Sequence, residues 1–212
     1  QLSGHARIAN GTFENFETGT AMRDLSLNIE GRRSEVFSFT MSARDSANGR
    51  LSAEGTISLA ADAAMPANIR AHFDNMRMVS RRDLVLAVDG ELSLKGSALP
   101  PNLDEPLKLE GSLTTTEARY LIPQQMPGGI SKIDVIIVHG PEESDNAQEA
   151  EEEKPLPLEL DLTLAIGNPP ARVTGRGVDS LWRGSVRVTG LVEDPVIEGV
   201  LTSERGTLDF AG

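Results

Sequence analysis

The sequence is first notable for what it lacks. It contains no cysteine, so it has neither a disulfide framework nor thiolate chemistry. Aromatic residues make up only 4% of the chain, which leaves few platforms for stacking bases or sugar rings. No apolar run approaches the ~18 residues that span a bilayer. Positive charge is scarce as well: 20 lysines and arginines against 32 aspartates and glutamates give a net charge of -12, which argues against nucleic acid as a partner.

Catalytic motifs are missing too. There is no Gly-x-Ser-x-Gly elbow, no phosphate-binding glycine loop and no His-Glu-x-x-His sequence. The three histidines, His5, His72 and His139, are far apart and lack the spacing of metal ligands. The adjacent carboxylates Asp104 and Glu105 precede a proline, and turn chemistry accounts for them. We therefore expect a protein that is not an enzyme and that carries no metal or other cofactor.

What the chain does have is long alternation of aliphatic and polar residues. From Leu158 to Ile166 every even position is a large aliphatic residue, and most odd positions are polar or charged. Successive side chains of a strand point to opposite faces, so this pattern predicts a long strand with one apolar face. The segments 84–94 and 107–113 show the same alternation.

The alternation extends over most of the chain and predicts an all-β fold. Helical periodicity is nearly absent: only 70–82 fits a short helix, and it fits a strand about as well. Turn residues at 31–34, 46–49, 100–102, 128–129 and 167–170 favour consecutive hairpins in a mostly antiparallel meander. The strands are expected near 2–16, 21–31, 35–44, 49–61, 68–79, 83–97, 106–122, 130–138, 156–167, 171–177, 180–192 and 195–210.

An internal repeat accompanies the strands. The segment Gly90–Gly96 resembles Gly184–Gly190, and each is followed by a second similar element, at 107–113 and 195–201. The repeated glycines fall on the apolar phase of their strands. Two interpretations remain open: β-bulges in an ordinary sandwich, or a strongly coiled sheet that folds over on itself with small residues where its walls converge.

One segment differs from the rest in composition. Residues 142–153 hold seven carboxylates and no large apolar residue, which predicts a solvated, disordered acidic loop at 140–155. The segment has no glycine for the tight turn of a Ca²⁺ loop. Apart from this loop we expect residues 1–212 to form a single domain. The chain begins and ends inside strand-like patterns, so we also expect it to be a fragment of a larger protein.

Long two-faced strands that curl over one another would enclose a groove lined by aliphatic side chains. We expect an open roll of this kind rather than a solid interior. The residues predicted to line the groove are Leu84, Leu86, Val88, Leu92, Leu94, Leu107, Leu109, Leu113, Leu158, Leu160, Leu162, Leu164, Ile166, Val186, Val188, Ile197 and Leu201.

The last part of the chain is similar to a known family. The similarity is carried by four motifs: Gly175-Arg176-Gly177, Trp182-Arg183-Gly184, Val188-Thr189-Gly190 and the ending from Arg205 to Gly212. These motifs resemble the carboxy-terminal region of the TamB family, the inner-membrane-anchored subunit of the translocation and assembly module. Related bridge-like and AsmA-like proteins share much of this sequence pattern.

The resemblance implies a fold, a location and a partner. The fold is a β-taco, a long folded-over sheet with an aliphatic groove. The location is the periplasm of a Gram-negative bacterium, with the parent protein anchored in the inner membrane. The partner is TamA, an Omp85-type protein of the outer membrane.

Three functions remain open on this basis. The first is a groove that carries phospholipid between the inner and outer membranes. The second is a chaperone that shields and inserts unfolded outer-membrane β-barrel or autotransporter polypeptides. The third is an inert structural β-domain. A lipid tail needs no specific polar contact, because each buried CH₂ contributes about 0.8 kcal/mol.

Overall fold

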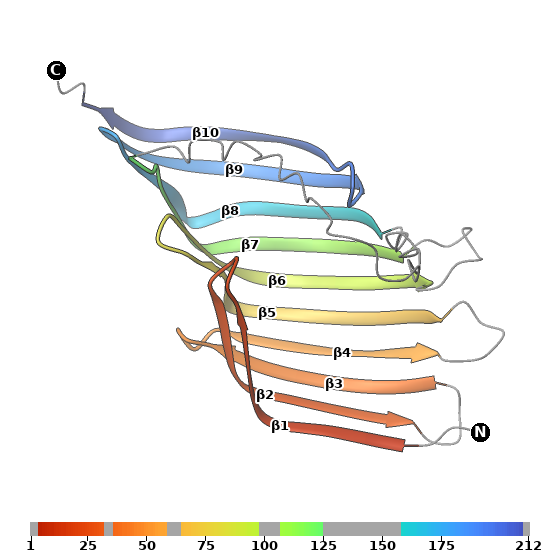
Figure 1. The fold of residues 1–212 in the computed structure, drawn as a ribbon. Helices are drawn as coiled ribbons and strands as arrows, with labels where there is room; N and C mark the ends of the chain where they lie inside the picture. Colours follow the sequence, from red (N-terminus) through yellow and green to blue (C-terminus); the bar gives the residue numbers. More distant parts are fainter. Residues whose placement is uncertain (1–3, 32–35, 59–64, 98–106, 125–157, 210–212) are drawn as a thin grey trace, which may run out of the picture.

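The computed structural model describes residues 4–31, 36–58, 65–97, 107–124 and 158–209, which form one open sheet of ten strands in chain order (Figure 1). The all-β prediction is therefore confirmed. The edges of the sheet are β1 and β10, and the sheet is not closed into a barrel. The strands are β1 (Gly4–Asn15), β2 (Thr20–Gly31), β3 (Val36–Asp45), β4 (Arg50–Ser58), β5 (Pro66–Ser80), β6 (Leu84–Ser97), β7 (Leu107–Leu121), β8 (Leu158–Gly175), β9 (Val178–Leu191) and β10 (Val196–Leu208).

Neighbouring strands are antiparallel with a single exception among the described strands, so the predicted meander is confirmed in the main. The exception is the parallel pair β7 and β8. A parallel pair needs a crossover connection longer than a hairpin turn. The residues between these two strands include 125–157, which lie outside the described part of the chain. The predicted strand at 130–138 and the predicted acidic loop at 140–155 both fall there.

The prediction of a turn at 167–170 is wrong. Strand β8 runs unbroken through Pro169 and Pro170, so the two strands expected at 156–167 and 171–177 are one. Proline is excluded from a regular ladder because it lacks a backbone donor, but it is tolerated at a bulge. The β8–β9 register shifts between Ile166 and Ala171, where no partners are paired across the prolines. The segment 70–82, which also fitted a helix, lies largely within strand β5.

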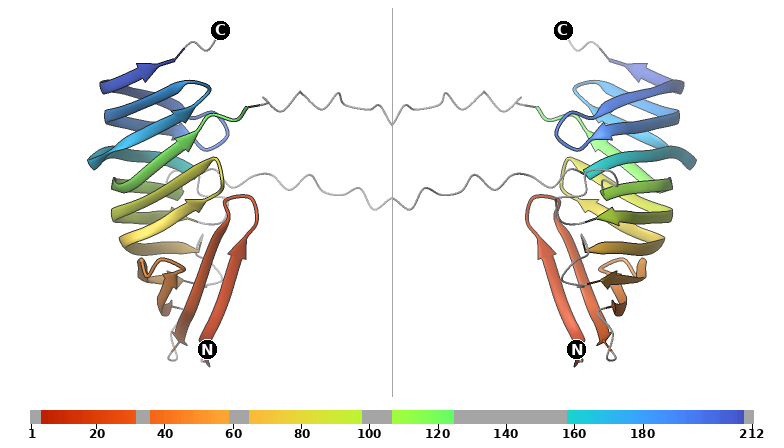
Figure 2. Two further views of the ribbon diagram at one scale, coloured as in Figure 1. Left: turned by 90° about the vertical axis from the view of Figure 1, so that its left-hand side faces the viewer. Right: turned by 90° about the vertical axis from the view of Figure 1, so that its right-hand side faces the viewer.

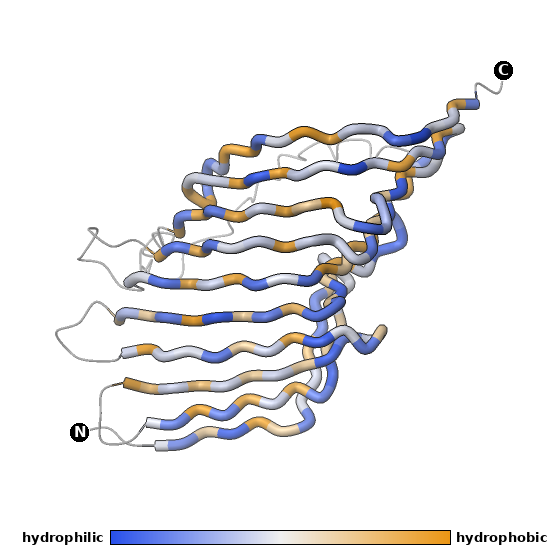
Figure 3. The backbone as a smooth tube through the Cα atoms, turned by 180° about the vertical axis from the view of Figure 1, so that it is seen from behind, coloured by the Kyte–Doolittle hydropathy of each residue, from blue (hydrophilic) through white to orange (hydrophobic). Residues whose placement is uncertain are grey.

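The pairing register sorts the side chains into rows that cross the sheet. Residues paired across neighbouring strands share a face, and the next residue along each strand faces the other way. Figure 3 shows the resulting alternation of hydrophobic and hydrophilic residues along the strands. One apolar row consists of Ile8, Leu27, Met41, Ala53, Ala71, Leu92, Gly111, Leu162, Val188 and Ile197. The adjacent polar row consists of Arg7, Asn28, Thr40, Glu54, Arg70, Ser93, Glu110, Asp161 and Thr189.

We call the two sides of the sheet the apolar face and the polar face. A second apolar row follows on one side of the first and includes Phe39, Ile69, Leu94, Leu109 and Leu160. A third apolar row on the other side includes Leu51, Phe73, Leu113, Leu164 and Val186. The apolar face is thus continuous over several rows and crosses all ten strands.

Register shifts of the kind that β-bulges cause occur in every ladder except β3–β4 and β4–β5. The strands bend in this part of the sheet (Figures 1 and 2). A bulge adds a residue to one strand, which kinks the strand and increases its twist. Asn10, Asp24 and Asn75 have φ of 55°, 53° and 46° beside register shifts in β1, β2 and β5. Asparagine and aspartate are the side-chain-bearing residues that best tolerate this left-handed conformation. The bend therefore has a local cause in the sequence.

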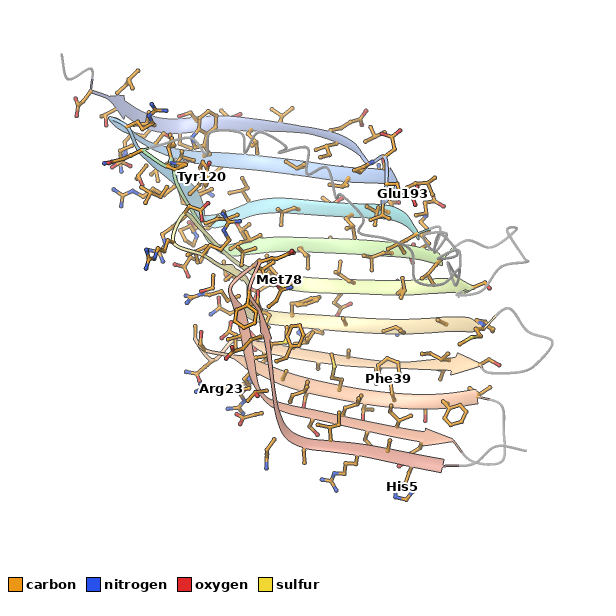
Figure 4. The ribbon with its side chains drawn as sticks, in the orientation of Figure 1. His5, Arg23, Phe39, Met78, Tyr120 and Glu193 are labelled. Atoms are coloured by element: carbon orange, nitrogen blue, oxygen red, sulfur yellow. The ribbon has the colours of Figure 1, made fainter. Side chains whose placement is uncertain are left out.

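The hydrophobic core lies at this bend. Its buried members are Leu51, Phe73, Met76 and Val88, and the partly buried Met22, Met41, Met78, Leu86 and Leu113 are among the residues that pack against them. The end of the β1–β2 hairpin, residues 13–22, folds over this core, and we call it the N-terminal arm (Figure 2). Figure 4 shows Met78 beside the arm. The Thr20 hydroxyl donates a hydrogen bond to the Met78 carbonyl at 2.6 Å.

The repeated glycines allow neighbouring strands to approach each other closely. A Cβ atom on Gly90 would lie 2.2 Å from the carbonyl oxygen of Ser112 on the paired strand, and its φ is +143°. The close approach at Gly90 is therefore one between neighbouring, paired strands. The ten described strands also form one sheet rather than the two layers of a sandwich.

Candidate functional site

The register brings the predicted groove-lining residues to one face. Leu92, Leu162, Val188 and Ile197 share one row, and Leu94, Leu109 and Leu160 share the next. Leu107 and Leu158 form a pair beyond them, and Leu113, Leu164 and Val186 lie on the opposite side of the first row. The remaining residues, Leu84, Leu86, Val88, Ile166 and Leu201, continue the same alternation toward the bend.

The exposure of these side chains varies with their position. Val88 is fully buried in the core at the bend, and Leu107 and Leu160 are buried as well. Ile197 and Leu201, on the edge strand, are 66% and 47% exposed. Most of the others are half-buried, as expected for residues shielded by their neighbours within one sheet layer. At about 4.8 Å per strand and about 3.4 Å per residue, the apolar rows cover roughly 40 Å across the sheet and roughly 20 Å along it.

The first half of the chain adds residues to this face that the groove prediction missed. Ile8, Leu27, Met41 and Phe39 continue the rows through β1, β2 and β3. The signal was present in the sequence, because Phe37, Phe39 and Met41 alternate with serine and threonine. It is weaker than in β8, since smaller residues such as Ala53 and Ala71 occupy the same rows in β4 and β5.

A shallow groove of about 880 Å³ lies on the polar face. Its lining side chains come chiefly from the polar rows of β3 to β8. They include Thr40, Ser52, Glu54, Arg70, His72, Glu91, Ser93, Glu110, Ser112, Asp161 and Thr163. This concavity is therefore not the aliphatic groove that the sequence predicts. The folded-over taco shape and its apolar inner groove stay predictions.

Ion pairs between neighbouring strands populate the polar face. Lys95 Nζ lies 2.8 Å from Glu110 Oε1, and Arg187 Nη2 lies 2.9 Å from Asp161 Oδ1. The hydrogen bond from Lys95, reinforced by one from the Ser93 hydroxyl, lowers the pKa of Glu110. Glu110 is therefore ionised at neutral pH, and a charged, hydrated surface of this kind does not attract acyl chains. The two faces differ sharply in what they can bind.

No cluster of three or more metal-ligating side chains occurs among the described residues. His72 contacts Glu91, with Nδ1 and Oε1 3.4 Å apart, and both side chains are more than half exposed. His5 lies on the edge strand β1, and His139 is outside the described ranges.

Comparison with known proteins decides the family. The protein-family model of the TamB C-terminal domain matches residues 39–212 of the sequence. This chain belongs to the TamB family. TamB proteins are bacterial envelope proteins with a role in the translocation and assembly module, and membership does not distinguish lipid transport from protein assembly. Searches of curated proteins and of solved structures find no significant match.

The match to the TamB model covers the repeat-bearing strands as well as the C-terminal motifs, since it begins in β3. Within the described part of this TamB domain there is no helix whose length and apolarity would suit it to crossing a membrane.

Proposed function

We propose that the apolar face of this TamB domain binds phospholipid acyl chains. In this proposal the domain forms one stretch of a path for phospholipid across the periplasm, between the inner and outer membranes, and works with TamA in the translocation and assembly module. The observation that carries the proposal is the continuity of the aliphatic rows, because one row runs without a polar residue from Ile8 in β1 to Ile197 in β10.

The direction of the rows matters for transport. They run across the strands, so an acyl chain lying along a row passes from one strand to the next and meets similar aliphatic side chains throughout. A chain that buries ten methylenes gains on the order of 8 kcal/mol without any specific polar contact. Uniform, non-directional binding of this kind lets a lipid slide rather than stop at one site.

The test is lipid capture by matched charge variants. Leu162→Lys places a charge in the centre of the apolar face, whereas Thr163→Lys places the same charge on the polar face one residue away. We expect native mass spectrometry to find bound phospholipid on the wild-type chain and on Thr163→Lys, and at least a tenfold loss on Leu162→Lys. Circular dichroism checks that both variants keep the sheet. Equal lipid capture by both variants would contradict the proposal.

A second candidate function is assistance to outer-membrane polypeptides as they assemble. The exposed apolar surface at β10 favours it: of the thirteen large hydrophobic residues that are exposed within the described part of the chain, seven lie between Leu191 and Leu208, in and beside β10. An open apolar edge offers backbone hydrogen bonds to an incoming strand. Photo-crosslinkers at Leu162 and at Ile197 separate the candidates, because phospholipid adducts at Leu162 support the first and polypeptide adducts at Ile197 support the second.

A further inference from the structure

The turns along one margin of the sheet are rich in arginine. Strands β3, β5, β7 and β8 all end on the side of the bend, so the β3–β4, β5–β6 and β8–β9 turns lie along the same margin (Figure 1). The cations in and beside these strand ends are Arg44, Arg50, Arg81, Arg82, Arg119, Arg172 and Arg176. We call this line of residues the arginine margin.

The opposite margin differs in its charged residues. Its described turn, between β9 and β10, holds Glu193 and Asp194 and no cation. Figure 4 shows Tyr120 and Glu193 toward the two opposite margins. The two lysines of the described chain, Lys95 and Lys108, lie toward the Glu193 side, and each is within 4 Å of a carboxylate oxygen. Unpaired positive charge therefore gathers on the side of the bend.

Part of the arginine margin is paired within the protein. Asp83 accepts two hydrogen bonds from Arg81, and Asp179 accepts two from Arg172. These bonds lower the pKa of both carboxyl groups, so both pairs are ionised at neutral pH. The remaining pairs are Arg119 with Glu117 and, at 3.9 Å, Arg50 with Asp74.

Three arginines of the margin are left for a ligand. Arg44, Arg82 and Arg176 are exposed, and none forms an ion pair with a carboxylate of the described residues. Asp45 follows Arg44, but its carboxylate is buried and accepts hydrogen bonds from backbone nitrogens. The three guanidinium groups come from turns two to three strands apart, which is about 10–15 Å.

An apolar row borders the arginine margin. Leu84 pairs with Tyr120, and Tyr120 pairs with Val173, on the apolar face. Arg82 precedes this row by two residues in the chain, and Arg176 follows it by three. Both the row and the margin cross the strands, so they run side by side. A ligand with acyl chains next to a phosphate group matches this arrangement.

We infer that the arginine margin binds the phosphate groups of phospholipids whose acyl chains lie on the apolar face. The inference deepens the proposed lipid path and rests on it. A guanidinium group presents parallel N–H donors that fit two oxygens of one phosphate, and it loses its hydration more readily than the ammonium of lysine. The repetition of unpaired arginines along the margin gives each phosphate a next site as the lipid moves.

The test separates the phosphate from the acyl chains. The full chain is incubated with detergent micelles that contain equal amounts of phosphatidylglycerol and of diacylglycerol with the same acyl chains, and the lipids that copurify are quantified. We expect phosphatidylglycerol to exceed diacylglycerol by about tenfold, the gain from one charge-assisted hydrogen bond. In the margin variant Arg44→Gln/Arg82→Gln/Arg176→Gln the two lipids should be retained equally, with diacylglycerol at its wild-type level.

The matched control is Arg70→Gln/Lys95→Gln/Arg187→Gln, which removes the same charge from the polar face. It should keep the wild-type ratio of the two lipids, and circular dichroism checks that both variants keep the sheet. An unchanged ratio in the margin variant, or the same loss in the control, would overturn the inference. Displacement of phosphatidylglycerol by a tenfold excess of inorganic phosphate would assign the margin to free phosphate and overturn it as well.

The same measurement distinguishes this failure from failure of the proposed function. Equal retention of the two lipids by the wild-type chain contradicts phosphate binding alone, because acyl chains are still bound. Retention of neither lipid contradicts acyl binding on the apolar face, and the inference falls with it.

Discussion

The carboxylate of Asp45 accepts a hydrogen bond from the backbone nitrogen of Arg77, with 2.6 Å between Oδ2 and N. Asp45 ends β3 and is only 1% exposed, and Arg77 lies in the bulged part of β5. The other carboxylate oxygen accepts hydrogen bonds from the backbone nitrogens of Ala47 and Gly49. One side chain thus ties the β3–β4 turn to the bulge in β5, at the bend where the N-terminal arm folds over the core.

The first prediction concerns this carboxylate. Asp45→Ala leaves three backbone N–H groups without their acceptor, and each costs about 1–3 kcal/mol when buried. We expect the free energy of unfolding in urea to fall by about 3 kcal/mol. Asp74→Ala is the control, because its side chain is 57% exposed and lies 3.9 Å from Arg50; it should change stability by less than about 0.5 kcal/mol. A small effect at Asp45 would show that the bend is held by other contacts.

The second prediction concerns the repeated glycines. In Gly90→Ala the new methyl group would lie 2.2 Å from the Ser112 carbonyl oxygen, at a φ of +143° that side-chain-bearing residues rarely adopt. We expect a loss of about 1–3 kcal/mol in thermal or chemical unfolding. Gly4→Ala should be close to neutral, because nothing lies within 4 Å of the added atom. Equal stability of the two variants would remove the argument that glycine permits close strand approach.

The sequence alone predicts those features of the fold that depend on the local alternation of apolar and polar residues. The pattern from Leu158 to Ile166 predicts both a strand and the face it presents, because the direction of each side chain follows from its position alone. The repeat of β6–β7 in β9–β10 likewise has a structural counterpart: Gly90 pairs with Leu113, and Gly184 pairs with Leu201 in the same way.

Features that depend on distant pairing were not predictable in the same way. Pro169 and Pro170 indicate a turn by local rules, but they lie in a strand because the β8–β9 ladder is interrupted beside them. The hydrogen bond from Thr20 to Met78 joins residues 58 positions apart. A threonine that bonds a backbone carbonyl leaves no pattern in the sequence, so the N-terminal arm could be found only in the fold.

The third prediction concerns the attachment of this arm. Thr20→Val keeps the shape of the side chain but removes its hydrogen bond to the Met78 carbonyl, which costs about 1 kcal/mol. We expect the arm to open more often, which should accelerate hydrogen exchange at the Ser80 amide, the donor to the Thr18 carbonyl at 2.8 Å. Thr56→Val, at an exposed position of β4, should leave this exchange unchanged. Unaltered exchange at Ser80 in Thr20→Val would mean that the hydroxyl does not hold the arm.

The fourth prediction concerns the ion pairs of the polar face. The pKa of Glu110 is lower in the folded chain than in the unfolded one, so the stabilisation by Lys95 is present above the unfolded pKa and is lost as the pH falls through the folded pKa. Lys95→Met should raise the pKa of Glu110 in a carboxyl NMR titration, and Ser93→Ala should raise it less. The pKa of Asp83, which Arg81 lowers, should not move. A Glu110 pKa that does not change in Lys95→Met would contradict the ion pair between these two residues.

The most direct measurement of the proposed function compares two adjacent residues on opposite faces. Leu162→Cys and Thr163→Cys each give a single labelling site, because the chain has no other cysteine. Each variant carries an environment-sensitive fluorophore and is mixed with phospholipid brominated in its acyl chains, which quenches only on contact. Acyl binding on the apolar face predicts strong quenching at residue 162 and little at residue 163. Equal quenching at both positions, or none at residue 162, would contradict it.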